Sequence, residues 1–143
     1  MNWLTLLTTL KLSVMSAIKF TVPIMPVTWP RPRFDRRNKI VFNSARYSEY
    51  KDTLGFFARQ AMRGLEPLRG EVRLYAEFYR PQPKPRKDKP QVSFIGDVDR
   101  YLNAVLDALI GICYFDDRQV TDIGGKKIFG LPHIVIELEE LQC

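Results

Sequence analysis

The chain has 143 residues and a mass of 16.7 kDa, a length that suits one compact domain and is too short for two of ordinary size. Because 45% of the residues are hydrophobic and 12% are aromatic, the chain can bury a core, which argues against wholesale disorder and fibrous architectures. The formal net charge of +6 favours a polyanionic partner.

The cysteine and histidine content limits the available chemistry. Two cysteines, Cys113 and Cys143, and a single histidine, His133, cannot build a cysteine-rich zinc module, a multi-histidine metal site or a disulfide framework within one chain. Any metal would be held mainly by oxygen, which favours hard cations such as Mg²⁺ or Mn²⁺. The low cysteine count is compatible with a reducing cytoplasm, where we expect the protein to act.

Residues 1–17 form an N-terminal extension with two interpretations. The segment has no basic region before its apolar residues and is too short and too polar to span a bilayer, so we expect no membrane association. Its apolar residues recur at helical spacing, which predicts a short amphipathic helix. They are Trp3, Leu6, Leu7, Leu10 and Val14. Alternatively, Met15 is the natural start of the chain.

The predicted domain covers residues 18–143 and begins with two strands. Apolar and polar residues alternate over 18–22, with Ile18, Phe20 and Val22 on one face, and a short strand follows at 40–42.

The first predicted helix begins after a capping residue, Asn43 or Ser44, and runs to Gly64. One face of this helix is apolar and is predicted to pack in the core. It consists of Tyr47, Tyr50, Leu54, Phe57 and Ala61.

The remaining elements complete a mixed fold. Residues 71–80 alternate and predict a half-buried strand. Its inner face consists of Val72, Leu74, Ala76 and Phe78. A second helix is predicted from about Asp99 to about Ile112. Residues 116–117 are predicted to form a turn that leads into a strand, and a last strand is predicted at 133–139. The fold class is therefore α/β (α+β): one small domain with two main helices packed on a mixed sheet.

Charge is divided between the two parts of the chain. Before Gly96 there are 18 Lys and Arg against 7 Asp and Glu, and from Gly96 onward 4 against 9, so the parts carry +11 and −5. The basic part has two proline-rich concentrations, at 29–39 and 80–90. Because proline at this density does not fit a helix interior or a central strand, both segments are predicted to be exposed loops.

Each basic loop is either a solvated linker or part of a surface that follows a DNA backbone. Two such loops in one small domain favour the surface, on which each neutralised phosphate would steepen the salt dependence of duplex binding by roughly 0.9 in log–log slope. The residues predicted to contact DNA are Arg31, Arg33, Arg36, Arg37, Lys84, Arg86, Lys87 and Lys89.

Residues 96–122 hold six acidic residues against two arginines. Asp97 and Asp99 are two positions apart, so both carboxylates point to the same side of an extended chain that enters the second helix. At about 5 Å and an effective dielectric constant near 20 the two charges repel by roughly 3 kcal/mol, so the pair needs a cation or a proton. A divalent metal would meet this need, and capping of the helix is the alternative role.

The other acidic residues also have structural interpretations. Asp107 inside the helix is expected to be solvated or locally paired, and Asp116 and Asp117 suit a turn. A helix of about 12 residues advances about 18 Å, and about seven extended residues return at most about 23 Å. Asp117 can therefore just reach the Asp97 and Asp99 pair within one chain, and completion of the site by a second subunit remains open.

Three motifs follow one another in a fixed order, ahead of an acid and a pair of lysines. They are G-D-V-D-R at 96–100, V-L-D-A-L at 105–109 and Y-F-D-D-R-Q-V at 114–120, followed by Asp122 and Lys126-Lys127. In this order and spacing the chain resembles the RusA-type crossover-junction endodeoxyribonucleases, which resolve Holliday junctions. The similarity spans roughly residues 18–139 and includes the Pro/Arg-rich segment at 30–34.

The resemblance implies that Asp97, Asp99 and Asp117 are the catalytic, Mg²⁺-binding carboxylates, with Mn²⁺ as a possible substitute and Asp116 beside them. It also implies a homodimer that nicks two opposing strands of a four-way DNA junction in recombination and repair, in a phage or prophage. A twofold protein suits such a symmetric substrate. Lys127 joins the residues predicted to contact DNA.

The chain departs from the family at two positions. The family commonly reads D-x-D-N-L-x-K, whereas Arg100 and Asn103 replace the asparagine and the lysine here. Either Arg100 or Lys127 supplies the missing positive charge, or the protein binds junctions with weak or lost cleavage. A third hypothesis is a basic module for single-stranded nucleic acid, which the acidic triad disfavours. Its stacking residues would be Trp29, Phe34 or Tyr79.

Overall fold

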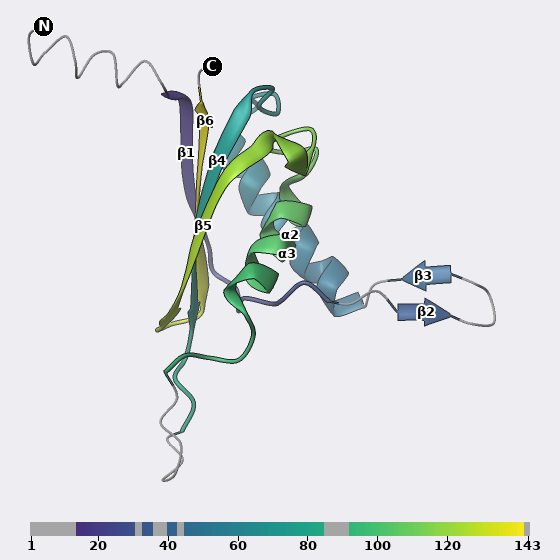
Figure 1. The fold of residues 1–143 in the computed structure, drawn as a ribbon, viewed down its shortest axis with the longest axis vertical. Helices are drawn as coiled ribbons and strands as arrows, with labels where there is room; N and C mark the ends of the chain where they lie inside the picture. The colour runs from purple at the N-terminus through teal and green to yellow at the C-terminus, as the bar shows by residue number, and fades with distance from the viewer. Residues whose placement is uncertain (1–13, 31–32, 36–39, 43–44, 85–91, 142–143) are drawn as a thin grey trace, which may run out of the picture.

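The computed structural model describes residues 14–30, 33–35, 40–42, 45–84 and 92–141, which build a mixed sheet with two helices on one face (Figure 1). The strands lie in the order β1, β6, β4, β5 across this sheet. They are β1 (Val14–Val22), β4 (Glu71–Arg80), β5 (Val120–Phe129) and β6 (His133–Leu141). The expected α+β class is confirmed.

The parallel pairing of β4 with β5 determines where the second helix lies. β6 pairs antiparallel with both β1 and β4, but β4 and β5 run in the same direction. A parallel pair needs a crossover connection, and α3 (Val98–Leu109) provides it. α3 therefore returns along β5 in the opposite direction, so that Leu102 packs over Gly125 and the Lys127 ammonium reaches the Gly96 carbonyl.

The helix α2 (Ala45–Met62) packs beside α3 on the same face of the sheet (Figure 1). Asp107 of α3 links the two helices, because its carboxylate accepts a hydrogen bond from the Tyr47 hydroxyl at 2.8 Å and pairs with the Lys51 ammonium at 3.1 Å. Of the helices in the described ranges, none is both long enough and apolar enough to cross a membrane.

The core lies between the helices and the inner faces of β4 and β6. Burial alternates along both strands, as the period of two in the sequence predicts. The buried strand residues are Val72, Leu74, Ala76, Phe78, Ile134, Ile136 and Leu138. Full burial of a large apolar side chain contributes about 1.5–3 kcal/mol, so this layer is the main source of stability for the sheet.

Most predicted elements are confirmed. The strand predicted at 71–80 has these bounds, and the first predicted helix and the last strand differ from α2 and β6 by one or two residues at their ends. The predicted apolar face of the first helix points into the core, with Tyr47, Tyr50 and Leu54 buried and the other two residues partly buried. The capping residues at 43–44 lie outside the described residues.

Two boundaries and one loop differ from the sequence prediction. β1 already begins at Val14, so the proposed N-terminal helix does not include this residue, and positions 1–13 lie outside the described part of the chain. α3 ends at Leu109 rather than near Ile112, because Ile110 is extended and Gly111 has a φ of +81°. The first basic loop, predicted to lack regular structure, contains a short strand.

That short strand is β2 (Arg33–Asp35), which pairs antiparallel with β3 (Ile40–Phe42). The two strands form a separate ribbon away from the main sheet (Figure 1). Proline is excluded from central strands but tolerated beside a two-stranded ribbon, so the prolines of the segment at 29–39 are compatible with this strand.

Replacing Gly125 with alanine is expected to lower the free energy of unfolding by about 1–3 kcal/mol, because overpacking at a filled site forces side chains off their rotamers. A Cβ at this position would lie 2.9 Å from Leu102 Cδ1. The matched control is Gly124→Ala, whose Cβ would lie 3.3 Å from the partly exposed ring of Tyr75. Urea unfolding, monitored by circular dichroism, compares the free energies of unfolding of the two variants. Equal values would contradict the close packing of α3 on β5.

Candidate active site

The turn before α3 holds the backbone tightly at Gly96. This glycine has a φ of +97°, and a Cβ there would lie 2.8 Å from Thr28 Cγ2, so only glycine fits without strain. The Tyr101 hydroxyl donates to the Ile95 carbonyl at 2.7 Å. The Lys127 ammonium donates to the carbonyls of Phe94 at 2.7 Å and Gly96 at 2.5 Å.

Asp97 and Asp99 follow this turn at the start of α3. Asp97 is the N-cap residue, yet its side chain makes no capping hydrogen bond, and Asp99 lies in the first turn. Both side chains are exposed, and among the described residues neither carboxylate has a hydrogen-bond or ion-pair partner. The capping role that the sequence left open is therefore absent for the Asp97 carboxylate, and both side chains are available to bind a cation.

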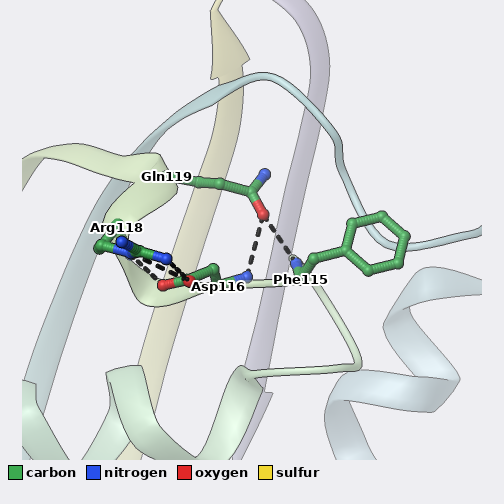
Figure 2. Close-up of polar contacts among 4 residues, drawn as sticks. All are labelled: Phe115, Asp116, Arg118 and Gln119. Atoms are coloured by element: carbon green, nitrogen blue, oxygen red, sulfur yellow. Dashed lines mark hydrogen bonds and ion pairs between the residues drawn. The ribbon is translucent and has the colours of Figure 1, made fainter.

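The turn that carries Asp117 is held by its neighbours (Figure 2). Asp116 caps the short 3-10 helix η1 (Asp117–Gln119), accepting from the Arg118 backbone N–H at 2.9 Å and from its guanidinium at 2.9 and 3.1 Å. The hydrogen bond from the Arg118 guanidinium, and after it the bond from the Arg118 backbone N–H, lower the pKa of Asp116 to about 2. Asp116 is thus committed to the turn, while Asp117 is exposed beside it.

Gln119 ties this turn to the chain segment before β4. Its Oε1 accepts from the N–H groups of Phe115 at 2.8 Å and Asp116 at 3.0 Å (Figure 2). Its Nε2 donates to the carbonyls of Leu68 at 2.7 Å and Gly70 at 3.0 Å. Gln119 was part of a sequence motif but had no predicted role, because its four partners are backbone groups that only the fold brings together.

The two groups of predicted metal ligands lie at opposite ends of α3. Asp97 and Asp99 are at its beginning, whereas Asp117 follows Tyr114, which forms a β-bridge with Ile110 just beyond the helix end. The 12 residues of α3 separate these ends by about 18 Å. Within the described ranges, no three His, Cys, Asp or Glu side chains lie close enough together to hold one metal ion.

The predicted ligands still fit a hard divalent cation in their chemistry. All three are aspartates, whose oxygens are the ligands that Mg²⁺ and Mn²⁺ prefer. One chain presents them as two half-sites: Asp97 with Asp99, and Asp117. Asp107 belongs to neither, because it pairs locally with Tyr47 and Lys51, as one of its two interpretations expected.

Three arginines line a groove beside Gly96, an arrangement that the sequence analysis did not predict. We call it the arginine groove and define it by Arg46 of α2, Arg80 of β4 and Arg100 of α3. Arg100 donates to the Trp29 carbonyl at 2.9 Å, and Arg80 donates to the Tyr101 hydroxyl at 3.1 Å. Arg80 belongs to the basic segment at 80–90 and Arg100 to the G-D-V-D-R motif, but the sequence did not predict that they meet Arg46, because the three residues are far apart in the chain.

The predicted DNA contacts are only partly described. Lys84 is exposed after β4, and Arg33 lies in β2. Lys127 is turned towards the Phe94 and Gly96 carbonyls and lies 4.9 Å from the Phe94 ring centroid, so it supports the turn before Asp97. That it also contacts DNA stays a prediction. The residues outside the described part of the chain are Arg31, Arg36, Arg37, Arg86, Lys87 and Lys89.

The fold and the site define a small α+β domain whose crossover helix has carboxylates at both ends and arginines around its start. Residues 23–139 match the family described as Endodeoxyribonuclease RusA, and the chain belongs to this family. It is also 32% identical over 143 residues to a protein of Bacillus subtilis (strain 168), "Uncharacterized protein YqaN", with 90% of this chain and 100% of that relative covered. Membership confirms the resemblance seen in the sequence and indicates endodeoxyribonuclease activity, DNA as partner and dependence on a divalent metal.

Replacing Gln119 with alanine is expected to lower the free energy of unfolding by about 1–3 kcal/mol, because four backbone groups lose their hydrogen-bond partner. Cleavage should fall as well, since the turn positions Asp117, while DNA binding should be retained. Urea unfolding and filter binding measure the two effects. Gln119→Glu keeps the two acceptor contacts but sets a carboxylate oxygen against the Leu68 and Gly70 carbonyls, so it should lose at least as much stability; an alanine variant as stable as the native chain would show that the four bonds contribute nothing.

Proposed function

We propose that this protein is a Mg²⁺-dependent endodeoxyribonuclease that resolves four-way junctions by paired symmetric nicks, with Mn²⁺ as a possible substitute. It would act as a homodimer in the cytoplasm, in the recombination and repair of phage or prophage DNA. The observation that carries the proposal is the start of α3, where Asp97 and Asp99 expose carboxylates without partners among the described residues in a chain of the RusA endodeoxyribonuclease family.

In this proposal Asp97, Asp99 and Asp117 would hold the cation, which when bound would polarise the phosphodiester, lower the pKa of the attacking water and neutralise the leaving oxygen. The chain itself supplies position. Lys127 holds the backbone at Gly96 and so orients Asp97, and Gln119 holds the turn that presents Asp117. No histidine or cysteine nucleophile is needed for hydrolysis by an activated water.

The separation of the two half-sites favours a site shared between two chains. Asp97 and Asp99 of one protomer would combine with Asp117 of the partner subunit, because α3 keeps the half-sites of one chain about 18 Å apart. A twofold dimer then contains two equivalent sites, which suits two symmetric nicks. The site would consequently exist only in the dimer.

The arginine groove gives the DNA backbone a place beside this site. Arg46, Arg80 and Arg100 converge next to Gly96, one residue from Asp97. Guanidinium groups pair readily with phosphate oxygens and fix position without reading base sequence. The basic loops at 31–39 and 84–89 would extend this contact, as their charge predicts.

A junction-binding protein with weak or lost cleavage is the second candidate. Either Arg100 or Lys127 was expected to replace the family lysine at position 103. The Arg100 guanidinium donates to the Trp29 carbonyl, and the Lys127 ammonium donates to two carbonyls. Both cations therefore make hydrogen bonds within the chain, which leaves fewer of their donors for the scissile phosphate and favours slow chemistry over loss of DNA binding.

A labelled synthetic four-way junction and a linear duplex, each with Mg²⁺ or with EDTA, test the proposed activity. Symmetric nicks in the junction are expected only with Mg²⁺, and Asp97→Asn should lower their rate by about 100-fold or more while junction binding is retained. The matched control is Asp107→Asn, an acid of the same helix outside both half-sites. Junction binding without nicks under every condition would instead support the second candidate.

Mixing two inactive variants tests whether the site is shared. If Asp117 comes from the partner subunit, a dimer of one Asp97→Asn and one Asp117→Asn chain keeps one intact site, so an equal mixture should recover about one quarter of the native sites. Such dimers would nick one strand only. A site within one chain predicts no recovery at all, because every chain then carries a damaged site.

Arg46→Ala tests the arginine groove. Junction affinity should fall, and the log–log salt slope should decrease by about 0.9, because one phosphate contact is lost. Arg59→Ala is the matched control, since it removes the same charge from α2 at a residue that does not line the groove. Salt titrations of binding measure both, and equal slopes for the two variants would remove Arg46 from the DNA path.

A further inference from the structure

A pocket of about 570 Å³ lies between the end of β4 and the segment that leads into Gly96. We call it the Arg80 pocket and define it by Met25, Arg80, Ser93, Phe94 and Ile95. Its walls are mostly apolar, and one guanidinium and one hydroxyl add polar groups. This composition and a volume within about 300–1,000 Å³ are typical of a site that binds a small organic group.

The guanidinium of Arg80 is held in place at this pocket. Its Nε donates to the Met25 Sδ at 3.1 Å, and its Nη1 donates to the Tyr101 hydroxyl at 3.1 Å. It also lies 5.9 Å from the centroid of the Phe94 ring. Nucleobases stack on guanidinium planes as they do on aromatic rings. Because this guanidinium is already fixed, a base could stack on it at little cost in side-chain entropy.

The pocket adjoins both the arginine groove and the proposed metal ligands. Arg80 and Ile95 line the pocket and the groove alike. Ile95 is two residues before Asp97, so their Cα atoms are at most about 7 Å apart. A DNA strand whose phosphates follow the groove would therefore carry the bases next to the cut past the mouth of the pocket.

We propose that the Arg80 pocket receives one unstacked nucleobase of the strand that is cut, beside the branch point, and so sets which sequence is cut. This inference rests on the proposed function, because it takes the four-way junction as substrate. It adds a site for a base to a surface that otherwise contacts phosphates. A base at the branch point has lost continuous stacking on one side, so it leaves the helix at lower cost than a base inside a duplex.

The polar groups of the pocket favour a base with a carbonyl oxygen. Among the described residues that line the pocket none is acidic, so no carboxylate there competes for the guanidinium. The two bonds of Arg80 use two of its five N–H donors, and a base carbonyl can accept from another. Of the four DNA bases only adenine lacks a carbonyl oxygen. Adenine at the occupied position should therefore lower the nicking rate by at least about 5-fold relative to the other bases.

The fluorescence of pyrrolocytosine tests whether a base enters the pocket. This cytosine analogue keeps the carbonyl oxygen and becomes brighter when it is unstacked. Separate junctions carry it at each nucleotide on either side of the branch point, and the protein carries Asp97→Asn so that the DNA stays uncut. Saturating protein should raise the fluorescence at one of these positions above that of the free junction.

Ser93→Trp in the same protein fills the pocket, because Ser93 is exposed and forms part of its wall. This variant should lose most of the fluorescence rise while the junction remains bound. The matched control is Val92→Trp, which adds the same side chain at a neighbouring residue that is 95% exposed and does not line the pocket. Its fluorescence rise should equal that of the parent protein. Circular dichroism checks that both variants are folded.

Nicking rates give a second measurement that does not depend on fluorescence. In the chain with Asp97 intact, Ser93→Trp should abolish the difference between adenine and the other bases, because the pocket no longer admits a base. Val92→Trp should keep this difference. A difference that Ser93→Trp leaves unchanged would show that another part of the protein selects the sequence.

The outcomes distinguish this inference from the proposed function. A chain that binds no junction overturns both. A junction that is bound but never nicked, with a fluorescence rise that Ser93→Trp removes, supports the pocket and overturns the proposed cleavage. Nicks without a fluorescence rise at any position, or a rise that Ser93→Trp leaves unchanged, overturn the pocket and keep the proposed function.

Discussion

The parallel pairing of β4 with β5 is the constraint on which the rest of the molecule depends. A parallel pair cannot be closed by a tight turn, so the chain must cross back over the sheet, and α3 is that crossover. As a result α3 and β5 run in opposite directions against each other. Lys127 at the end of β5 meets the turn before Asp97, while Asp117 before β5 remains at the far end of α3.

The acidic residues divide by their bonding rather than by their position in the sequence. Asp107 and Asp116 have strong partners within the chain, and both serve the fold, one between the helices and one in the turn before β5. Asp97 and Asp99 have none among the described residues. A pair of neighbouring carboxylates without partners is stabilised by a cation, which is why these two residues carry the proposed chemistry.

The two-chain site connects the arrangement of charge with the kind of substrate. Each chain presents one carboxylate pair beside the arginine groove and one single carboxylate beyond the other end of α3. Neither half-site brings three carboxylates together alone, so cleavage would depend on assembly. A dimer with two equivalent sites would then act on both strands of a symmetric junction, and a lone chain would not cut DNA at random.

Apolar periodicity alone determined most of the fold. The alternation over 71–80 and the helical spacing from Tyr47 to Leu54 identified elements and buried faces, because side-chain direction follows directly from backbone geometry. Acidic spacing likewise predicted that Asp97 and Asp99 bind a metal, and this stays a prediction. Only the tertiary structure decided that Asp117 lies apart from them, that Gln119 holds the turn, and that Arg46, Arg80 and Arg100 share a groove. These are relations between residues distant in the chain, and their distances depend on how strands and helices pack, which local sequence patterns do not encode.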